Sequence, residues 1–428
     1  MKSLKWVLAI IAFVFTASLA EAKVQIDVYG KSFKRLTIAV PSFKGERPDN
    51  IKTEMNELLN KDLELSGFFI VAPKSLLDKE LTDEGVDKEE INFGNWRSIG
   101  VELLCKVRLA NKEDKVALEA WVYDSMDGSL MLAKRYIAEP IDWRRVIHRL
   151  ADEIIQVATG EKGIMSSRIL FVSGSRFNKE LYTADIDGAS HRKLTSFKSI
   201  TLSPSVSSTG KYVAYTSYKE GKPNLFIMDS LGSRDIRADR EDGMKLGSHW
   251  LNANTLVFSY TSGRYSTIYS LNVETGEKKI IMKKDGILAS PSVSPDGSKM
   301  VFVSDMYGSA QIFIRDMSIG ETKRLTYSGN YNSAPSFSPK GDRIAFVSKL
   351  DGSFEICTMR PDGSEQIVLT NGNGAVNDSP YFSPCGRYII YSSRSGGKST
   401  INLMLFNGEN RRVLKLIEGG GEQPKFMP

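Results

Sequence analysis

Short apolar runs alternate with polar turns throughout residues 166–428, and the alternation repeats at a nearly constant interval. In one copy the apolar run 300–303 follows a Pro-Asp-Gly turn at 295–297, and a second apolar run comes at 311–314. Runs of β-branched and aromatic residues bounded by Gly, Pro, Asp and Asn predict strands joined by hairpin turns. The middle runs are apolar on both faces, which predicts sheets that stack face to face.

Each copy opens with a phrase of the type Pro-Ser-Val-Ser-Pro-Asp-Gly. The phrase begins at Pro204, Pro291, Pro335 and Pro380, in steps of 87, 44 and 45 residues, and the first step equals two periods. A degenerate copy is therefore expected near residue 248, where Ser-His-Trp-Leu-Asn occupies 248–252. A period in the low forties with four strand-like runs is typical of a β-propeller blade.

The two ends of the repeat region predict how the ring closes. Residues 168–195 supply three strands without a Pro-Ser strand before them, and residues 424–428 begin 44 residues after Pro380. The last residues are thus expected to complete the first blade, which leaves no open sheet edge. The sequence predicts a six-bladed β-propeller over residues 163–428, closed by its C-terminal strand.

Residues 23–162 have a mixed pattern instead, with two helical stripes that end at Gly67 and Gly160. The stripes are formed by Ile51, Met55, Leu58, Leu59 and Leu63, and by Trp143, Val146, Ile147, Leu150, Ile154 and Ile155. Strand-like runs cover residues 35–40, 68–71, 101–109, 116–123 and 130–136. Two helices against a small mixed sheet predict an α/β N-terminal domain with its own core.

The first 22 residues form a predicted signal peptide. Lys2 and Lys5 precede an apolar run at 6–15, and small residues follow up to Ala20 and Ala22. This order is typical of a secretory leader cleaved after Ala22 or after Ala20. A membrane anchor is the alternative, but the apolar run is short for a bilayer span. We therefore expect an exported, soluble protein with no direct membrane insertion.

Charge and cysteine content place few further constraints on function. The net charge of +6 falls to +5 once residues 1–22 are removed, and no block of like charge predicts nucleic-acid binding. Cysteines occur at Cys105, Cys357 and Cys385, without metal-like spacing. The last two lie in neighbouring predicted blades, so a bridge between them stays open, but we expect a fold that does not depend on disulfides.

Little catalytic chemistry is present in the sequence. No zinc-binding spacing relates the three histidines, which are His148, His191 and His249. Nucleophile-elbow, phosphate-loop and dinucleotide-binding motifs are absent. Aspartates recur beside Gly or Ser at Asp296, Asp362 and Asp378, where turn formation is favoured over calcium binding. We expect no metal, no cofactor and no catalytic residue, and therefore a binding function.

Together these features resemble the TolB family of periplasmic proteins. The junction at 159–163 with the strand at 167–172 resembles the family's domain join, and residues 95–102 resemble its N-terminal domain. The similarity covers essentially the whole mature chain, whereas the repeat alone is shared with prolyl-oligopeptidase-type propellers. The third blade departs from the pattern, because Trp-Leu-Asn-Ala-Asn at 250–254 replaces the usual phrase and leaves its turn geometry open.

The resemblance implies a non-enzymatic, monomeric adaptor of the Tol–Pal system in the periplasm. Its implied partners are the inner-membrane protein TolA and the peptidoglycan-associated lipoprotein Pal. The implied role is to maintain outer-membrane integrity and to draw that membrane inward during cell division. One alternative is a secreted propeller hydrolase or peptidase, which would require an additional α/β-hydrolase domain. Another is a propeller that binds a small ligand in its pore.

Two partner sites are predicted. The resemblance implies that TolA recognises the new N-terminus, whose polar and apolar residues alternate as in a strand that can join a partner sheet. That segment comprises Lys23, Val24, Gln25, Ile26, Asp27 and Val28. For Pal, the loops that enter the innermost strands are expected to form one mouth of the propeller, with apolar anchors and polar groups together. Those residues are Ile200, Leu246, Leu288, Tyr331, Asn332, Asn377, Asp378 and Glu422.

Overall fold

The computed structural model describes residues 34–77, 81, 83–112, 114–233, 235–372, 374–417 and 419–427. The predicted signal peptide at 1–22 and the predicted TolA-binding segment at 23–28 lie outside these residues. Among the helices in the described ranges, none has the length and apolar character needed to cross a membrane.

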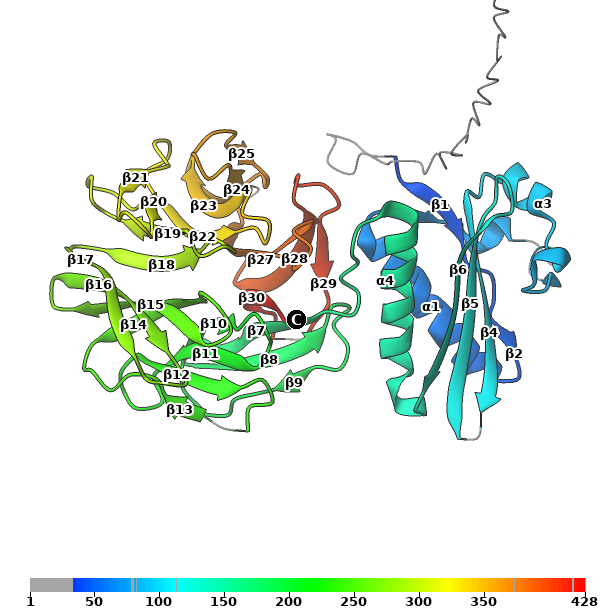
Figure 1. Ribbon diagram of the computed structural model, residues 1–428, viewed down its shortest axis with the longest axis horizontal. Helices are drawn as coiled ribbons and strands as arrows, with labels where there is room; N and C mark the ends of the chain where they lie inside the picture. Colours follow the sequence, from blue (N-terminus) through cyan, green and yellow to red (C-terminus); the bar gives the residue numbers. More distant parts are fainter. Residues whose placement is uncertain are drawn as a thin grey trace, which may run out of the picture. The chain divides into compact units, whose positions relative to one another are not determined.

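The N-terminal part is a mixed sheet with two long helices along one face (Figure 1). The sheet order is β3-β1-β4-β5-β6, with β1 parallel to β3 and β4, and β4, β5 and β6 forming an antiparallel meander. A short strand, β2, pairs with β4. The bounds are β1 (Leu36–Ala39), β2 (Lys44–Gly45), β3 (Phe69–Val71), β4 (Leu103–Lys112), β5 (Lys115–Asp124) and β6 (Leu130–Ala138). This is the predicted α/β domain.

The two long helices form where the apolar stripes predicted them. Helix α1 (Asp49–Ser66) ends at Gly67 and helix α4 (Trp143–Thr159) ends at Gly160, and both glycines adopt the left-handed conformation that closes a helix. Leu59, Leu63 and Ile147 of the two stripes are fully buried. The sequence did not predict the shorter elements α3 (Phe93–Ser98), η1 (Lys74–Leu76), η2 (Lys88–Glu90) and η3 (Pro140–Asp142).

The rest of the described chain is a β-propeller, built of antiparallel sheets arranged around a common centre (Figure 1). One four-stranded sheet has the order β30-β7-β8-β9, with bounds β30 (Glu422–Met427), β7 (Arg168–Ser175), β8 (Asn178–Asp185) and β9 (Arg192–Lys193). The next contains β10 (Thr201–Val206), β11 (Tyr212–Ser217), β12 (Asn224–Asp229) and β13 (Asp235–Arg237). It is followed by β14 (Met244–Trp250), β15 (Thr255–Ser262), β16 (Tyr265–Asn272) and β17 (Lys278–Asp285).

The remaining strands form one four-stranded sheet and one eight-stranded sheet. The four-stranded sheet contains β18 (Leu288–Val293), β19 (Lys299–Ser304), β20 (Gln311–Asp316) and β21 (Thr322–Arg324). The first half of the larger sheet contains β22 (Asn332–Phe337), β23 (Ile344–Leu350), β24 (Ser353–Met359) and β25 (Ile367–Val368). Its second half contains β26 (Val376–Phe382), β27 (Tyr388–Ser395), β28 (Lys398–Leu405) and β29 (Arg412–Leu414). A single parallel pair, Phe354 with Val376, connects the halves.

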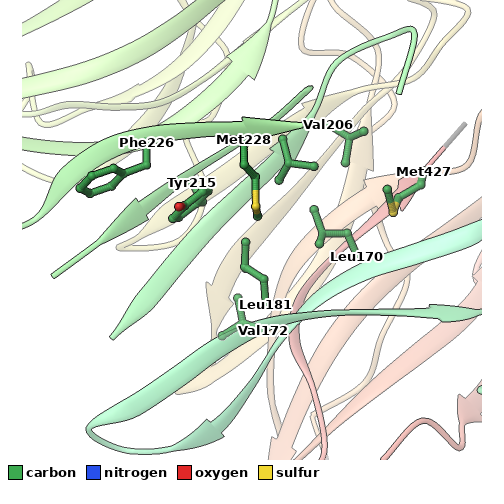
Figure 2. Close-up of a cluster of buried hydrophobic side chains, with 9 residues drawn as sticks. Leu170, Val172, Leu181, Val206, Tyr215, Phe226, Met228 and Met427 are labelled. Carbon is green, nitrogen blue, oxygen red and sulfur yellow. The ribbon is translucent and has the colours of Figure 1, made fainter. Parts of the chain in front are cut away.

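The C-terminal strand β30 pairs with β7, which confirms the pairing predicted from the 44-residue spacing. Lys425 lies opposite Leu170, and Phe426 lies opposite Ile169. Met427 then packs in a buried cluster with side chains of β7, β8, β10, β11 and β12 (Figure 2). The two ends of the propeller region are therefore joined both by the hydrogen-bond ladder and by apolar packing.

The third-blade turn differs from its counterparts, as the changed phrase suggested. In the copy at 204–210, the backbone N–H of Ser207 donates to Tyr212, five residues on, and Gly210 has a φ of 70°. In the third blade, the N–H of Leu251 donates to Thr255, four residues on. The Asn252 side chain accepts the N–H groups of Asn254 and Thr255 at 3.0 and 2.8 Å. An asparagine-closed turn thus replaces the glycine-containing one.

Candidate binding channel

The innermost strands of the propeller surround a central channel of about 260 Å³. Residues of β10, β14, β18, β22, β26 and β30 line its wall. Each of these strands contains an irregularity in its pairing with the next strand outward. The channel wall is therefore formed by a repeated β-bulge rather than by regular strands.

One channel-lining residue of each innermost strand has a positive φ. The angles are 52° at Ser203, 58° at Gly247, 49° at Ser290, 48° at Ala334, 54° at Ser379 and 51° at Gln423. L-residues rarely adopt this left-handed conformation, so the surrounding sheets must hold it in place. The bulge changes the direction of the side chains that follow it. The next two residues of each strand therefore face the channel wall or the core of the blade.

Lys425, Asp378 and His249 give the channel its charge and polarity. Each lies within two residues of a bulge residue with positive φ. The Lys425 ammonium lies 4.3 Å from the centre of the Tyr381 ring. Burial lowers the pKa of Lys425 to about 8, although nearby Asp378 partly opposes this. Burial also raises the pKa of Asp378, whose Oδ1 accepts the N–H of Ser379 at 2.7 Å. The channel thus places an ammonium group and a carboxylate on neighbouring blades.

His249 contributes a neutral imidazole to the same wall. Its Nδ1 accepts the backbone N–H of Val293 at 3.3 Å. Burial lowers the pKa of His249 to about 4, and the charge of Lys425 acts in the same direction. The ring is therefore uncharged at neutral pH and acts there as a polar, hydrogen-bonding group.

Two of the predicted Pal-site residues, Tyr331 and Asp378, line this channel. The Tyr331 side chain is 42% exposed, and its ring packs edge-on against Phe354 at a centroid distance of 5.9 Å. Asp378 is also exposed, although the channel wall surrounds its carboxylate and raises its pKa. These two residues can contact a group that enters the channel mouth.

Three other predicted residues are buried and belong to the scaffold. Leu288 is 1% exposed and packs in an apolar cluster with Val293 and Phe302. The Asn332 amide donates to Gln311 Oε1 and to the carbonyl of Ser328, both at 2.9 Å. The Asn377 amide donates to the carbonyl of Phe354 at 3.1 Å and to Glu355 Oε2 at 3.3 Å. These side chains hold the mouth loops in place. Replacing one of them would therefore change partner binding only by moving a loop.

The last three predicted residues lie away from the channel wall. Ile200 is half-buried beside Lys179, with which it forms an isolated parallel bridge. Leu246 lines a groove of about 380 Å³ between neighbouring blades. Glu422 forms an ion pair with Lys179, accepts a hydrogen bond from Ser399 Oγ at 3.1 Å, and lines a separate groove of about 1150 Å³. The predicted ring of residues is thus distributed over several hollows.

Sequence reasoning missed the channel residues His249, Tyr381 and Lys425. All three occupy the same place in the repeat, directly after the position of the first proline in the phrase. In the other three copies this place is serine, at Ser205, Ser292 and Ser336. The change from serine to a larger polar or aromatic group at this place of the repeat was the signal in the sequence. The position also has a structural role, because Ser292 Oγ accepts the N–H of Phe337 at 3.2 Å just as His249 accepts that of Val293.

Asp296 and Asp362 have the turn geometry that was favoured for the recurring aspartates, whereas Asp378 lies in strand β26 and not in a turn, so that prediction was wrong for it. Asp296 Oδ1 accepts hydrogen bonds from Ser294 Oγ at 2.5 Å and from the N–H of Ser298 at 3.1 Å. Asp362 Oδ1 accepts the N–H and the hydroxyl of Ser364 at 2.9 and 2.6 Å. The cysteines Cys105, Cys357 and Cys385 are free thiols.

Comparisons with known proteins agree with this architecture. The family model described as the TolB beta propeller domain matches residues 155–428, and that of the TolB amino-terminal domain matches residues 24–131. "Protein TolB homolog" of Chlorobium luteolum is 34% identical over 282 residues, which cover 66% of this chain and 64% of that protein. "Tol-Pal system protein TolB" of Desulfosudis oleivorans is 33% identical over 222 residues, which cover 51% and 50%.

A solved structure shows the same fold over a longer span. The crystal structure of TolB from Acinetobacter baumannii matches with a TM-score of 0.82 and 24% identity, covering 92% of this chain and 97% of that chain. By contrast, the sequence alignments with the two curated relatives span only 64% and 50% of their lengths.

Proposed function

Because the chain belongs to the TolB family, we propose that it is a non-enzymatic, monomeric periplasmic adaptor of the Tol–Pal system. It binds Pal and TolA, and it supports outer-membrane integrity and the inward movement of that membrane during cell division. The central channel carries the proposal: an ammonium group, a carboxylate and an exposed tyrosine lie around one opening on a rigid support. Rigid sites of this mixed character suit protein recognition.

The domain organisation that we propose has an α/β domain at 23–162 and a six-bladed propeller at 163–428. Two observations support six blades. The halves of the eight-stranded sheet, β22–β25 and β26–β29, have the same strand order, and one residue pair joins them. The left-handed bulge also recurs at six places along the chain, once in each innermost strand.

Pal would bind at the channel mouth, with Tyr331 as the direct contact. Replacing Tyr331 with Ala should lower Pal affinity by about 1–3 kcal/mol, since truncating a packed aromatic contact removes both buried area and shape. Tyr327→Ala is the matched control, because Tyr327 is 73% exposed and does not line the channel. Calorimetric titration of Pal into both variants measures the effect. Equal affinities would place the Pal site elsewhere.

TolA would bind the segment at 23–28. Its alternating side chains suit the addition of a strand to a partner sheet, in which backbone hydrogen bonds supply much of the affinity. A mature protein that lacks residues 23–28 should therefore lose TolA binding and keep Pal binding. Surface plasmon resonance with each partner in turn separates the two sites. Full TolA affinity in the shortened protein would refute this assignment.

A further inference from the structure

A buried histidine lies where helices α1 and α4 meet the β8–β9 turn. His148, on α4, is 3% exposed, and Asp62, on α1, is fully buried. The Nδ1 atom of His148 lies 2.7 Å from Asp62 Oδ2. A carboxylate at this distance accepts the Nδ1 proton, so it fixes both the tautomer and the orientation of the ring.

In the part of the chain that the structure describes, no group forms a hydrogen bond with the other ring nitrogen of His148. Nε2 is buried without a hydrogen bond, and with Nδ1–H donated to Asp62 it presents a lone pair. Asp185 and Asp187, at the end of β8 and in the turn that follows, lie close to the His148 ring. One potential ligand atom from each of these three residues lies within 4.8 Å of the other two.

The surroundings carry an excess of negative charge. Four carboxylates gather here, from Asp62, Asp152, Asp185 and Asp187. Two guanidinium groups face them: Arg144 pairs with Asp187, and Arg168 Nε lies 3.4 Å from Asp185 Oδ1. Metal binding requires His148 to be neutral, and the balance of these groups is then two negative charges, which a divalent cation would neutralise.

We propose that His148, Asp185 and Asp187 bind a zinc-class divalent cation. One imidazole nitrogen and two carboxylate oxygens form a three-residue set of the kind that binds zinc and leaves a position for water. Asp62 is the positioning residue, since metal-bound histidines usually donate their second ring proton to a carboxylate. Binding would bring these ligand atoms, which lie within 4.8 Å of one another, to about 2.0–2.2 Å from the metal.

Sequence spacing argued against zinc because the ligands come from two domains. His148 belongs to the last helix of the N-terminal domain, whereas both aspartates belong to the first sheet of the propeller. The domains already touch nearby, where the Tyr388 hydroxyl donates to the carbonyl of Ser66 at 2.8 Å. A bound cation would add a strong cross-link to this contact.

The test is zinc titration of the chelator-stripped mature chain by calorimetry. We expect one Zn²⁺ per chain, and at least tenfold weaker binding in both His148→Gln and Asp187→Asn. The Asp187 side chain is 17% exposed, so Asp187→Asn should fold even if the histidine variant does not. Asp62→Asn should weaken binding by about 10–100-fold, as expected for a residue that orients a ligand.

His191→Ala is the matched control. His191 is exposed and lies just beyond the same turn, so it is the nearest alternative zinc ligand. This variant should bind Zn²⁺ like the wild type, and Zn²⁺ should raise the melting temperature of both but not that of Asp187→Asn. The proposal is wrong if the wild type takes up no Zn²⁺, and water would then occupy the space between His148 and the two aspartates. It is equally wrong if Asp187→Asn binds as the wild type does, or if only His191→Ala loses binding.

Discussion

Lys425 shows what a single buried charge costs in stability. Its position in the repeat is serine in three of the other copies, and two of these, Ser292 and Ser336, line the channel. Placing an ammonium group there removes it from bulk water, which lowers its pKa to about 8 from the ordinary lysine value of 10.5. When the Lys425 ammonium group is charged, a partner that enters the channel can interact with it strongly, because little water competes for the charge.

Lys425→Met should reveal this cost as a pH-dependent gain in stability. A lowered pKa in the folded state means that the unfolded chain binds more protons between pH 8 and 10.5, so wild-type stability rises with pH in that window. The variant should therefore exceed the wild type by about 1–3 kcal/mol at pH 7, and by much less at pH 9.5.

Urea unfolding at the two pH values measures the difference. Lys323→Met is the control, since the Lys323 side chain is 70% exposed and should show no such pH dependence. An equal effect of Lys425→Met at both pH values would show that burial does not lower the pKa of this ammonium group.

At the scale of elements, one hydrogen-bond pattern recurs in three blades. A threonine that follows a leucine on the chain accepts a backbone N–H and donates to a buried side chain of the neighbouring strand. In one blade, Thr370 Oγ1 accepts the N–H of Ile356 at 2.9 Å and donates to Glu355 Oε2 at 2.6 Å. Thr195 with Glu180 and Thr326 with Gln311 repeat this geometry. In these three blades, the hydrogen bonds connect the short outer segment to the middle strand.

Thr370→Val should destabilise the protein by about 1–3 kcal/mol, because it leaves the N–H of Ile356 without its acceptor in a buried place. Thr370→Ser keeps the hydroxyl and should recover most of the loss. The free energy of unfolding in urea measures both variants. If the serine variant is as unstable as the valine variant, the methyl group matters and the hydroxyl does not.

Strands and long helices were predictable because their signals are local. The apolar runs bounded by turn residues and the helical stripes ended by Gly67 and Gly160 each lie within one stretch of sequence. Helix α3, by contrast, has only six residues and no apolar period, and it is held by Trp96, whose Nε1 donates to Glu84 at 2.7 Å. The channel residues depend on left-handed bulges in six separate strands, so no single stretch of sequence could place them.

At the scale of the whole molecule, the propeller depends on a contact between residues about 250 positions apart. Besides the β30–β7 ladder, Ser173 Oγ donates to the carbonyl of Gly420 at 2.7 Å, and Lys179 pairs with Glu422. Contacts so distant in sequence form only after a large loss of chain entropy, so the closing strand must offset that loss through burial and ladder hydrogen bonds.

Deleting residues 424–428 should therefore cost several kcal/mol and lower the melting temperature clearly. Phe426 and Met427 are 3% and 8% exposed, and their removal uncovers apolar surface on β7 and on the sheet of β10–β13. The backbone groups of β7 would also lose their ladder partners and form an open edge.

A point variant distinguishes the contribution of side-chain packing from that of strand pairing. Phe426→Ala keeps the strand and should cost about 3–5 kcal/mol. Phe177→Ala, at 72% exposure, should change stability little. Differential scanning calorimetry measures all three proteins, and an unchanged melting temperature in the shortened chain would show that β30 does not hold the propeller closed.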